Sequence, residues 1–344
     1  MSVGYVSDPI YQQHETNDHV EGKDRLTAIE TVLEKARVKE QLQLIQPRQA
    51  TIDEIAAIHD RDYIQELKKE IDSGGGWLDP DTYVSRGSWD AALYAAGGLM
   101  NAVDSVMSKN HSSAFALVRP PGHHAVHMHQ MGFCLFNNMA VAARYALKNH
   151  NIKRIIIIDF DVHHGNGTQE AFYTDQQVLY CSTHEYPWYP FTGRADETGD
   201  KAGQGCNLNV PMEADTGDVE YLRVFNEVIT PVAKRYQPDL VMVSAGYDAH
   251  WKDTISNINL TTTGYARIAR MIKAIADECC EGRMVYTLEG GYHRSALAFS
   301  VAATFEILLG HDEILDPFGE PPATHSPPEF DGFITMLRNI HKLD

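Results

Sequence analysis

Two acidic residues and one histidine in this sequence have the types and spacing of metal ligands. Asp161 and His163 are two positions apart, just after an apolar run at 154–158. In extended backbone, residues i and i+2 point to the same side, so the carboxylate and the imidazole can bind one ion together. Asp248 follows a second apolar run, at 240–244, and can complete a set of three ligands. Two carboxylates and one imidazole suit zinc and leave a fourth position open, which is typical of a catalytic site.

Each part of this pattern also has an ordinary structural explanation. An Asp-x-His sequence alone is far more often structural or solvated than a metal site, and Asp248 alone could be the N-cap of a helix. The combination favours a metal site, because four polar clusters each follow a separate apolar run. The clusters occupy residues 119–125, 159–168, 245–250 and 289–293.

Acid–base groups accompany these ligands. His123 and His124 are adjacent in a loop with proline and glycine, and paired histidines beside a metal suggest proton transfer. Either histidine taken singly could equally be a core or supporting residue. Tyr292 follows Gly290 and Gly291, which let the backbone approach a ligand closely, so its hydroxyl could donate to a developing oxyanion. Taken alone, Gly-Gly-Tyr is only a turn.

The elements that must position these residues can be read from hydrophobic periodicity. Four short apolar runs have the character of buried strands, and they lie at 113–118, 154–158, 240–244 and 284–288. Helical periodicity predicts helices at 25–36, 51–71, 89–108, 137–148, 219–236, 262–278 and 295–309. Buried strands that alternate with helices predict an α/β fold with a mostly parallel sheet covered on both faces.

All four polar clusters follow predicted strands. Open α/β sheets bind ligands at the carboxyl ends of their strands, so we expect the clusters to meet in one site. The stretches at 73–80 and 186–205, rich in glycine and proline, are expected to be surface loops inside one domain, because the alternation continues through them. The proline-rich stretch at 317–328 is expected to be a loop before a short C-terminal helix.

Composition limits the classes of function. With 43% hydrophobic residues the chain can bury a sizeable core, which argues against disorder. The net charge of −18, without a dense basic run, argues against a nucleic-acid partner and favours cationic ones. Five cysteines without a C-x-x-C motif indicate a reducing compartment and no disulfide framework. The start MSVGYVSDPI does not look like a signal peptide, and the aliphatic runs are too short to span a bilayer, so we expect a soluble cytoplasmic protein.

Five motifs together resemble the histone deacetylase and acetylpolyamine amidohydrolase superfamily. They are RPPGHHA, MGFCLFNN, DFDVHHGNGT, SAGYDAH and LEGGYH, and the likeness extends from about residue 11 to 309. The asparagine in HHGNG and the form SAGYDAH are closer to class II deacetylases and their bacterial relatives. The resemblance implies an arginase-like α/β fold with a central eight-stranded, mostly parallel sheet. It also implies a single domain over 1–344, with a catalytic core at about 11–310 and a C-terminal tail at 311–344.

The resemblance implies roles for individual residues. Asp161, His163 and Asp248 become zinc ligands, as their spacing also suggests, and Tyr292 polarises the substrate carbonyl. A structural potassium ion is implied near the zinc, with ligands among Asp159, Asp161, His163, Ser182 and Thr183, partly through backbone carbonyls. The positions that line the acyl-lysine channel are Gly132, Phe133 and Tyr189. Arg25 matches an arginine near an internal cavity of the family.

The paired histidines are distinguished by the partners that the resemblance implies. His123 would pair with Asp159, and His124 with Asn166. A carboxylate stabilises an imidazolium more than a neutral amide does, so we expect His123 to stay protonated and His124 to shuttle the proton. The expected reaction is deacetylation of N-acylated lysine side chains, in peptides or proteins, or of small acylated amines.

Other functions remain open from the sequence. An acetylpolyamine amidohydrolase is one, although Ile255 stands where a polyamine-specific relative has an acidic gatekeeper. An arginase-like ureohydrolase would need two manganese ions and could recruit Asp159 and Asp253. A non-catalytic acyl-lysine reader and an amidohydrolase for another metabolite are the remaining alternatives. The sequence does not determine the oligomeric state, so a homo-oligomer stays open.

Overall fold

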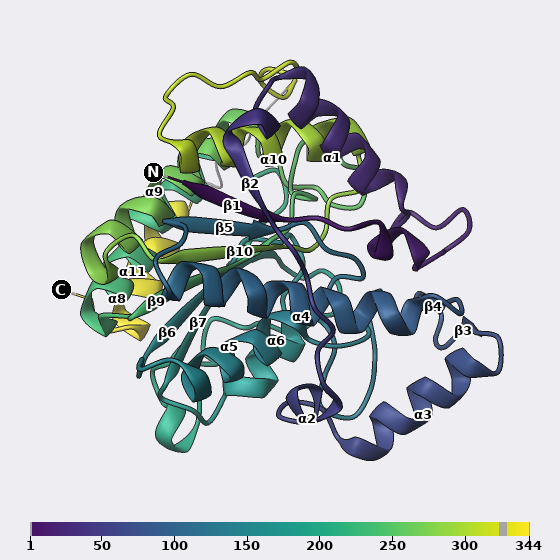
Figure 1. Ribbon diagram of the computed structural model, residues 1–344. Coiled ribbons are helices and arrows are strands. Elements are labelled where there is room, and N and C mark those ends of the chain that lie inside the picture. Colours follow the sequence, from purple (N-terminus) through teal and green to yellow (C-terminus); the bar gives the residue numbers. More distant parts are fainter. Residues whose placement is uncertain (1, 323–328, 344) are drawn as a thin grey trace.

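Eight strands form one sheet in which every neighbouring pair is parallel (Figure 1). The computed structural model describes residues 2–322 and 329–343. The strand order is β2-β1-β5-β10-β9-β6-β7-β8. The strands are β1 (Val3–Val6), β2 (Leu42–Ile45), β5 (Ser113–Ala116), β6 (Ile155–Asp159), β7 (Val178–Glu185), β8 (Asn207–Met212), β9 (Leu240–Ala245) and β10 (Met284–Leu288).

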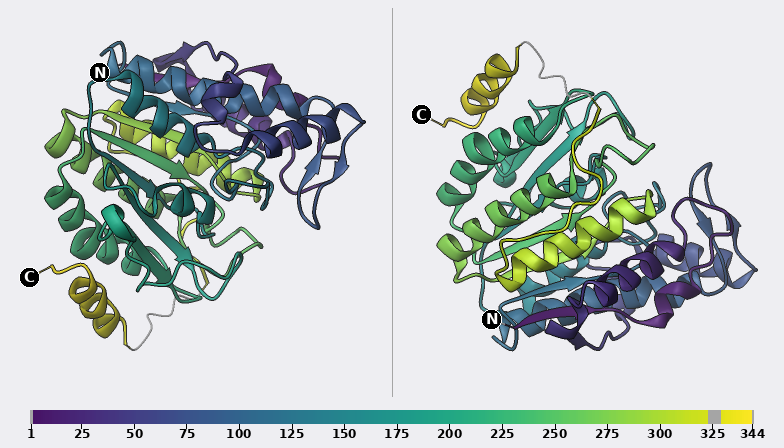
Figure 2. Two further views of the ribbon diagram at one scale, coloured as in Figure 1. Left: turned by 90° about the horizontal axis from the view of Figure 1, so that it is seen from below. Right: turned by 90° about the horizontal axis from the view of Figure 1, so that it is seen from above.

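Helices cover both faces of this sheet. On one face α1, α10 and α9 lie side by side, and on the other α4, α5 and α6 do so (Figures 1 and 2). The helices are α1 (Asp24–Lys35), α2 (Ile52–Ile55), α3 (Arg61–Asp72), α4 (Ser88–Met107), α5 (Asn138–Asn149), α6 (Asn166–Phe172), α7 (Asp218–Val224), α8 (Thr230–Tyr236), α9 (Thr262–Cys280), α10 (Arg294–Leu309) and α11 (Phe330–Ile340). The arrangement is the single-domain α/β fold expected from the sequence. Among the described helices, none has the length and apolar character that a bilayer crossing requires.

The four strands predicted from apolar runs are all present as β5, β6, β9 and β10. Their side chains are buried throughout, because helices cover both faces, and this is why they read as continuous apolar runs. The other four strands of the sheet were not predicted from periodicity. In β7 the polar residues of Val178–Glu185 are buried, and β8 contains two asparagines and a proline, so neither resembles an apolar strand in sequence.

The predicted helix over 51–71 is wrong in one respect, because the chain forms two helices there. Helix α2 ends at Ile55 and α3 begins at Arg61. Asp60 between them is extended (φ −64°, ψ 141°), and its side chain accepts a hydrogen bond from the backbone N–H of Asp62. Its own backbone N–H donates to the carbonyl of His127. This N-cap and the tertiary contact interrupt a helical periodicity that continues across the break.

The helix predicted at 219–236 is present but not uniformly α-helical. Helix α7 passes into a π-helical turn at Phe225–Ile229 and then into α8. The loop expected at 73–80 contains β3 (Gly76–Trp77), which pairs in antiparallel fashion with β4 (Tyr83–Val84). The stretch at 186–205 is a loop with one 3-10 turn at Lys201–Gly203.

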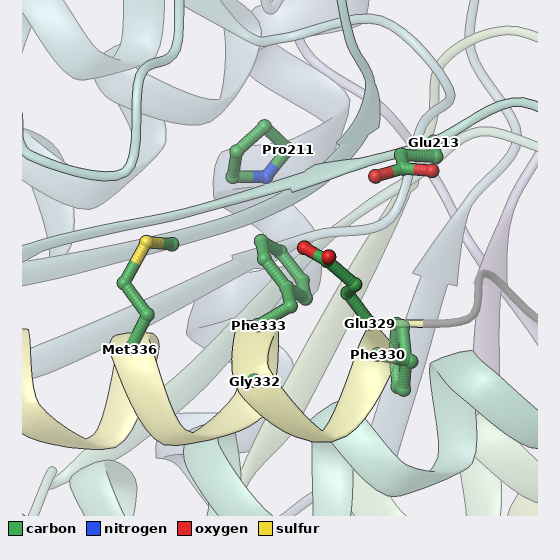
Figure 3. A pocket seen from close by; sticks show the side chains of 7 residues that line it. All are labelled: Pro211, Glu213, Glu329, Phe330, Gly332, Phe333 and Met336. Atoms are coloured by element: carbon green, nitrogen blue, oxygen red, sulfur yellow. The ribbon is translucent and has the colours of Figure 1, made fainter.

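Helix α11 confirms the short C-terminal helix predicted from the sequence. Part of the proline-rich stretch before it, residues 323–328, lies outside the described residues. Phe333 and Met336 of α11 point toward Pro211 of β8, the last strand of the sheet (Figure 3). Between them lies a cavity of about 440 Å³, which Glu213 and Glu329 also line. Helix α11 therefore lies against the β8 edge of the sheet.

Candidate active site

The four polar clusters of the sequence meet at one edge of the sheet. They follow β5, β6, β9 and β10, which are neighbours in the order β5-β10-β9-β6. Because all four strands are parallel, their carboxyl ends lie together. The expectation of a single site is therefore confirmed by the topology.

Asp161, His163 and Asp248 lie close enough to hold one metal ion. One ligand atom from each falls within 4.8 Å of the others, and all three residues are buried. His163 Nδ1 lies 3.0 Å from Asp161 Oδ1 and 3.2 Å from Asp248 Oδ2. Backbone N–H groups fix the remaining carboxylate oxygens, since Val162 donates to Asp248 Oδ1 and Gly290 donates to Asp161 Oδ2.

The chemistry of this donor set fits a divalent cation. Asp248 Oδ2 is buried and accepts no hydrogen bond within the described part of the chain, although buried polar atoms are usually paired. Burial and the neighbouring Asp161 carboxylate raise the pKa of Asp248 to about 6. Burial alone would lower the pKa of His163, but its contacts with the two carboxylates raise it to about 10. A cation at this point would compensate both buried carboxylates.

Gly290 keeps the space beside the carboxylates open. A Cβ at this position would lie 2.1 Å from Asp248 Oδ2 and 2.6 Å from Asp161 Oδ2. Any other residue would therefore collide with two of the three candidate ligands. This explains why a glycine precedes Gly291-Tyr292 at the end of β10.

His123 lies against a buried carboxylate. Its Nδ1 is 3.1 Å from Asp159 Oδ2, and the hydroxyl of Tyr180 donates to the same oxygen at 2.9 Å. Burial alone would lower the pKa of His123, but the charges of Asp161 and Asp159 raise it to about 10. An imidazolium is therefore the stable form of this side chain.

His124 lies beside His123 but has a neutral partner. Its Nδ1 is 2.8 Å from Asn166 Oδ1. Burial and the neighbouring histidines, His123 and His163, hold the pKa of His124 well below its usual value. Its ring is neutral at pH 7 and can accept a proton. The two adjacent histidines thus differ in charge, as their expected partners suggested.

Tyr292 is held in the site through its backbone. The carboxylate of Asp253 accepts hydrogen bonds from the N–H groups of Tyr292 and His293, at 2.6 and 2.9 Å. The guanidinium carbon of Arg25 lies 5.1 Å from the centre of the tyrosine ring. Burial and the Asp248 carboxylate raise the pKa of Tyr292 well above its usual value, so the hydroxyl keeps its proton and can donate it in a hydrogen bond.

A cavity of about 430 Å³ leads to these groups. Its lining includes His124, His163 and Tyr292 together with the three channel residues predicted from the sequence, Gly132, Phe133 and Tyr189. The other lining residues are Asp81, Pro187, Trp188, Phe191 and Ile255. The walls are thus mainly aromatic and apolar, and the two histidines of the lining are buried.

Gly132 brings the channel wall close to His124. A Cβ at Gly132 would lie 2.3 Å from His124 Cδ2, and its φ of +56° also favours glycine. The ring of Tyr189 packs edge-on against His124, with ring centres 5.2 Å apart. Phe133 packs edge-on against Tyr292 at 5.7 Å. These contacts leave His124 little freedom to turn.

The residues expected to hold potassium lie at the neighbouring ends of β6 and β7. Asp159 is opposite Ser182 in the register of these strands. Ser182 Oγ lies 2.9 Å from His184 Nδ1, whereas Thr183 Oγ1 is buried and has no hydrogen-bond partner among the described residues. Successive side chains of a strand point to opposite faces, so the two hydroxyls cannot both reach one ion. At least one of these residues would have to bind through its carbonyl oxygen.

Several supporting residues were missed from the sequence. Tyr180 bonds Asp159, and Glu289 accepts the backbone N–H groups of Gly122 and His123. Burial raises the pKa of Glu289 to about 7. The motif LEGGYH contains Glu289, but its sequence gives no indication that the carboxylate reaches back to the loop of His123.

A buried ion-pair cluster supports the Tyr292 segment from behind. Glu21 accepts hydrogen bonds from Arg119 at 2.5 and 2.7 Å and from Arg25 at 3.0 Å. Arg25 also donates to the carbonyl of Gly291 at 2.7 Å and to that of Glu289 at 2.5 Å. Arg25, expected near an internal cavity, therefore ties α1 to the strand end that carries Tyr292.

Known proteins share this fold and these motifs. The family model described as "Histone deacetylase domain" matches residues 19–308. The chain is 42% identical to histone deacetylase 14, chloroplastic, of Arabidopsis thaliana, over 96% of this chain and 82% of that protein. It is 39% identical to a probable deacetylase of Archaeoglobus fulgidus, over 91% and 88%. The crystal structure of the HDA15 HD domain superposes with a TM-score of 0.90 at 34% identity, covering 99% of this chain and 94% of that one.

Proposed function

This chain belongs to the histone deacetylase family, and we propose that it is a zinc-dependent deacetylase of N-acylated lysine side chains or small acylated amines. One observation carries the proposal. A three-residue ligand set, a neutral histidine and a protonated tyrosine converge on one apolar cavity. A Lewis acid, a general base and a hydrogen-bond donor to the oxyanion can together hydrolyse an amide.

Asp161, His163 and Asp248 would hold the zinc ion. The buried Oδ2 of Asp248 faces His163 Nδ1 and accepts no hydrogen bond from the described residues, and Gly290 lies close to both carboxylates; both observations support this assignment. Zinc bound there would supply a Lewis acid for the amide carbonyl and would lower the pKa of water. The potassium ion is proposed from the resemblance, with the ligand set given above, and would take its oxygen donors from the adjoining ends of β6 and β7.

The protein side chains would perform the proton transfers. His124 Nδ1 is engaged with Asn166, which leaves Nε2 to accept a proton from the attacking water and to return it to the leaving amine. The Tyr292 hydroxyl would donate a hydrogen bond to the carbonyl oxygen as negative charge develops on it. His123 would stay charged beside Asp159 and stabilise that negative charge electrostatically. Asn166 would keep the His124 ring in the orientation that the transfer requires.

The cavity walls support a substrate with an apolar stem. Phe133 and Tyr189 would contact the methylene groups of an acylated lysine. Ile255 lies in the lining at a position where an acidic residue would favour a polyamine. We therefore propose acylated lysines as the substrates, with acetylpolyamines as the alternative.

A substrate panel on purified, zinc-loaded protein tests the proposal. It compares acetyl-lysine peptides, longer acyl-lysine peptides, acetylspermidine and acetylputrescine, with acetate or the longer acid as the measured product. We expect acyl-lysine turnover that a zinc chelator abolishes. No release from any of these substrates would contradict the proposal, and urea release from arginine with two manganese ions per chain would identify a ureohydrolase instead.

The variant His124→Ala separates catalysis from metal binding. We expect it to keep one zinc per chain, because it removes no ligand, and to lose roughly 10²–10⁴-fold in kcat. Tyr292→Phe, which keeps the ring packing, should lose about 10²–10³-fold. Acyl-lysine binding without turnover by the unsubstituted protein would identify a reader. Nearly full activity of His124→Ala would rule out the assigned proton shuttle.

A further inference from the structure

Phe191 is an exposed aromatic side chain at the cavity that leads to the proposed catalytic groups. It belongs to the cavity lining, yet its relative exposure is 73%. A side chain that borders a cavity and remains exposed must lie at its mouth, where the part of a substrate outside the cavity passes.

The backbone conformation of Phe191 is unfavourable for its residue type. Its φ is +65°, in the left-handed region where bulky side chains are rare. Of the ten non-glycine residues with positive φ in the described part of the chain, two are aromatic, Phe133 and Phe191. Both line this cavity. Strained residues concentrate at ligand-binding positions, because the surrounding structure there imposes the conformation.

Contacts on both sides of Phe191 impose this conformation. The indole N–H of Trp188 donates to the carbonyl of Ile255 at 3.0 Å. The Thr192 hydroxyl lies 2.7 Å from His164 Nδ1. The N–H of Phe191 itself donates to the carbonyl of Trp188 at 2.6 Å. The loop is therefore tied to its surroundings immediately before and after the exposed ring.

Gly193 completes the anchoring. Its carbonyl lies 2.8 Å from His184 Nε2, and its φ is +91°. A Cβ at Gly193 would lie 2.4 Å from the same nitrogen, so the loop can be this close to His184 only with glycine there. The ring of Phe191 thus lies on a loop whose position is fixed by these contacts.

The cavity lining indicates what the ring contacts. Among the described residues of the lining, Asp81 supplies the one carboxylate, and burial raises its pKa. A small polyamine keeps a positive charge after mono-acetylation, and this lining offers that charge one carboxylate at most. A peptide that carries an acylated lysine instead presents uncharged backbone and Cβ atoms there, which an exposed phenylalanine can cover.

From these observations we infer that Phe191 is a specificity-determining residue that selects acylated lysines carried on a peptide over small acylated amines. The inference rests on the proposed deacetylase function and deepens it. Phe191 contacts the peptide on either side of the acylated lysine, whereas acetylputrescine, which is about as long as the acylated side chain alone, does not extend to it.

The variant Phe191→Gly tests this inference, because glycine fits the left-handed conformation. The measured quantity is the ratio of kcat/KM for an acetyl-lysine peptide to kcat/KM for acetylputrescine. We expect the ratio to fall roughly tenfold, as for the loss of one apolar contact in a specificity pocket. Phe191→Tyr keeps the ring and should keep the ratio. The melting temperature of Phe191→Gly should equal or exceed that of the parent, since strain is relieved.

A matched control is Asp215→Gly. Asp215 is also exposed with a positive φ of 67°, but it does not line the cavity. The variant Asp215→Gly should leave the ratio of the two kcat/KM values unchanged. An unchanged ratio in Phe191→Gly, with an active parent, would overturn the inference and leave the proposed function intact. If Phe191→Gly misfolds, Phe191→Leu gives the same comparison with a smaller expected fall. A parent inactive on both substrates would overturn the proposed function and this inference with it.

Discussion

The pKa values of two neighbouring histidines in this site are shifted in opposite directions, because the charges around the two rings differ. His123 faces Asp159 and is held as an imidazolium, whereas His124 faces the amide of Asn166 and is held neutral. Both rings are buried, so the surrounding charges decide between the two forms. The proposed role of His124 in proton transfer therefore depends on residue 166 being uncharged.

Asn166→Asp should therefore change the pH dependence of the reaction. A carboxylate opposite His124 stabilises its imidazolium and raises its pKa. A general base works in its deprotonated form, so the acid limb of the kcat/KM profile should move to higher pH. Below that limb the activity should fall about tenfold for each pH unit by which the limb moves. The measurement is kcat/KM from pH 5 to 9. The control is Asn166→Leu, which adds no charge and should lower the rate without moving the acid limb to higher pH. If the pH profile of Asn166→Asp matches that of the parent, His124 is not the base.

At the scale of single residues, candidate ligands could be predicted from the sequence where they are close together in the chain. Asp161 and His163 are two positions apart, and the topology of the parallel sheet brings Asp248 to them. The supporting residues could not be predicted in this way. Arg25 and Gly291, for example, are 266 positions apart, and nothing in either segment indicates that they bond.

At the scale of elements, the buried Glu21 cluster joins three parts of the fold. Glu21 belongs to the loop before α1, Arg119 follows β5, and Arg25 reaches the end of β10. Burial alone would raise the pKa of Glu21, but Arg119, a hydrogen bond with His14 and the charge of Arg25 hold it well below its usual range. The cluster therefore fixes the distance between the N-terminal loop and the Tyr292 segment.

Glu21→Gln should destabilise the protein by about 3 kcal/mol at pH 7, because it leaves two buried cations without their anion. The folded pKa of Glu21 is lowered, so its stabilisation is fully present above the unfolded value of about 4.3 and is lost as pH falls through the folded pKa. The difference between variant and parent should shrink below about pH 4. Urea unfolding of both proteins at pH 7 and pH 3 measures this difference in the free energy of unfolding.

Glu15→Gln provides the control for this measurement. Glu15 pairs with Lys23 in the same loop, but both side chains are nearly half exposed. Exposed pairs contribute about 0–1 kcal/mol, so this variant should unfold almost as the parent does. Equal effects of the two substitutions would show that the buried cluster has no special stabilising role.

The elements themselves were predictable to different degrees. Strands β5, β6, β9 and β10 form continuous apolar runs because they are covered on both faces, and these four precede the polar clusters. Periodicity did not reveal strand β7, because its buried side chains include serine, threonine and histidine. The eight-stranded sheet was expected only through the family resemblance. The break between α2 and α3 depends on a contact between Asp60 and His127, which periodicity does not reveal.

At the scale of the whole molecule, the proposed metal site should couple zinc to global stability. Asp161 and Asp248 are buried carboxylates with one imidazole between them. An ion that binds only the folded state stabilises it by about 2.7 kcal/mol at a free concentration of 100 times its Kd. Protein stripped of metal by a chelator should therefore gain several degrees in melting temperature on addition of zinc.

Asp248→Asn is the matched variant, because it keeps an oxygen to accept the Val162 N–H but removes the charge. Its melting temperature should respond much less to zinc. Magnesium should have little effect on the parent, since the site includes an imidazole and few oxygens. A response to zinc that is the same in parent and variant would place the bound ion somewhere other than this ligand set.

Pro211, which helix α11 faces in Figure 3, has a consequence for how copies of this molecule meet. It lies on β8, the last strand of the sheet, where an unpaired edge could recruit a strand from another chain. Proline has no N–H to offer such a strand, and Phe333 and Met336 of α11 face it across a cavity. A strand from another chain that paired with β8 would therefore lack one backbone hydrogen bond at Pro211, which makes growth of the sheet at this end less favourable.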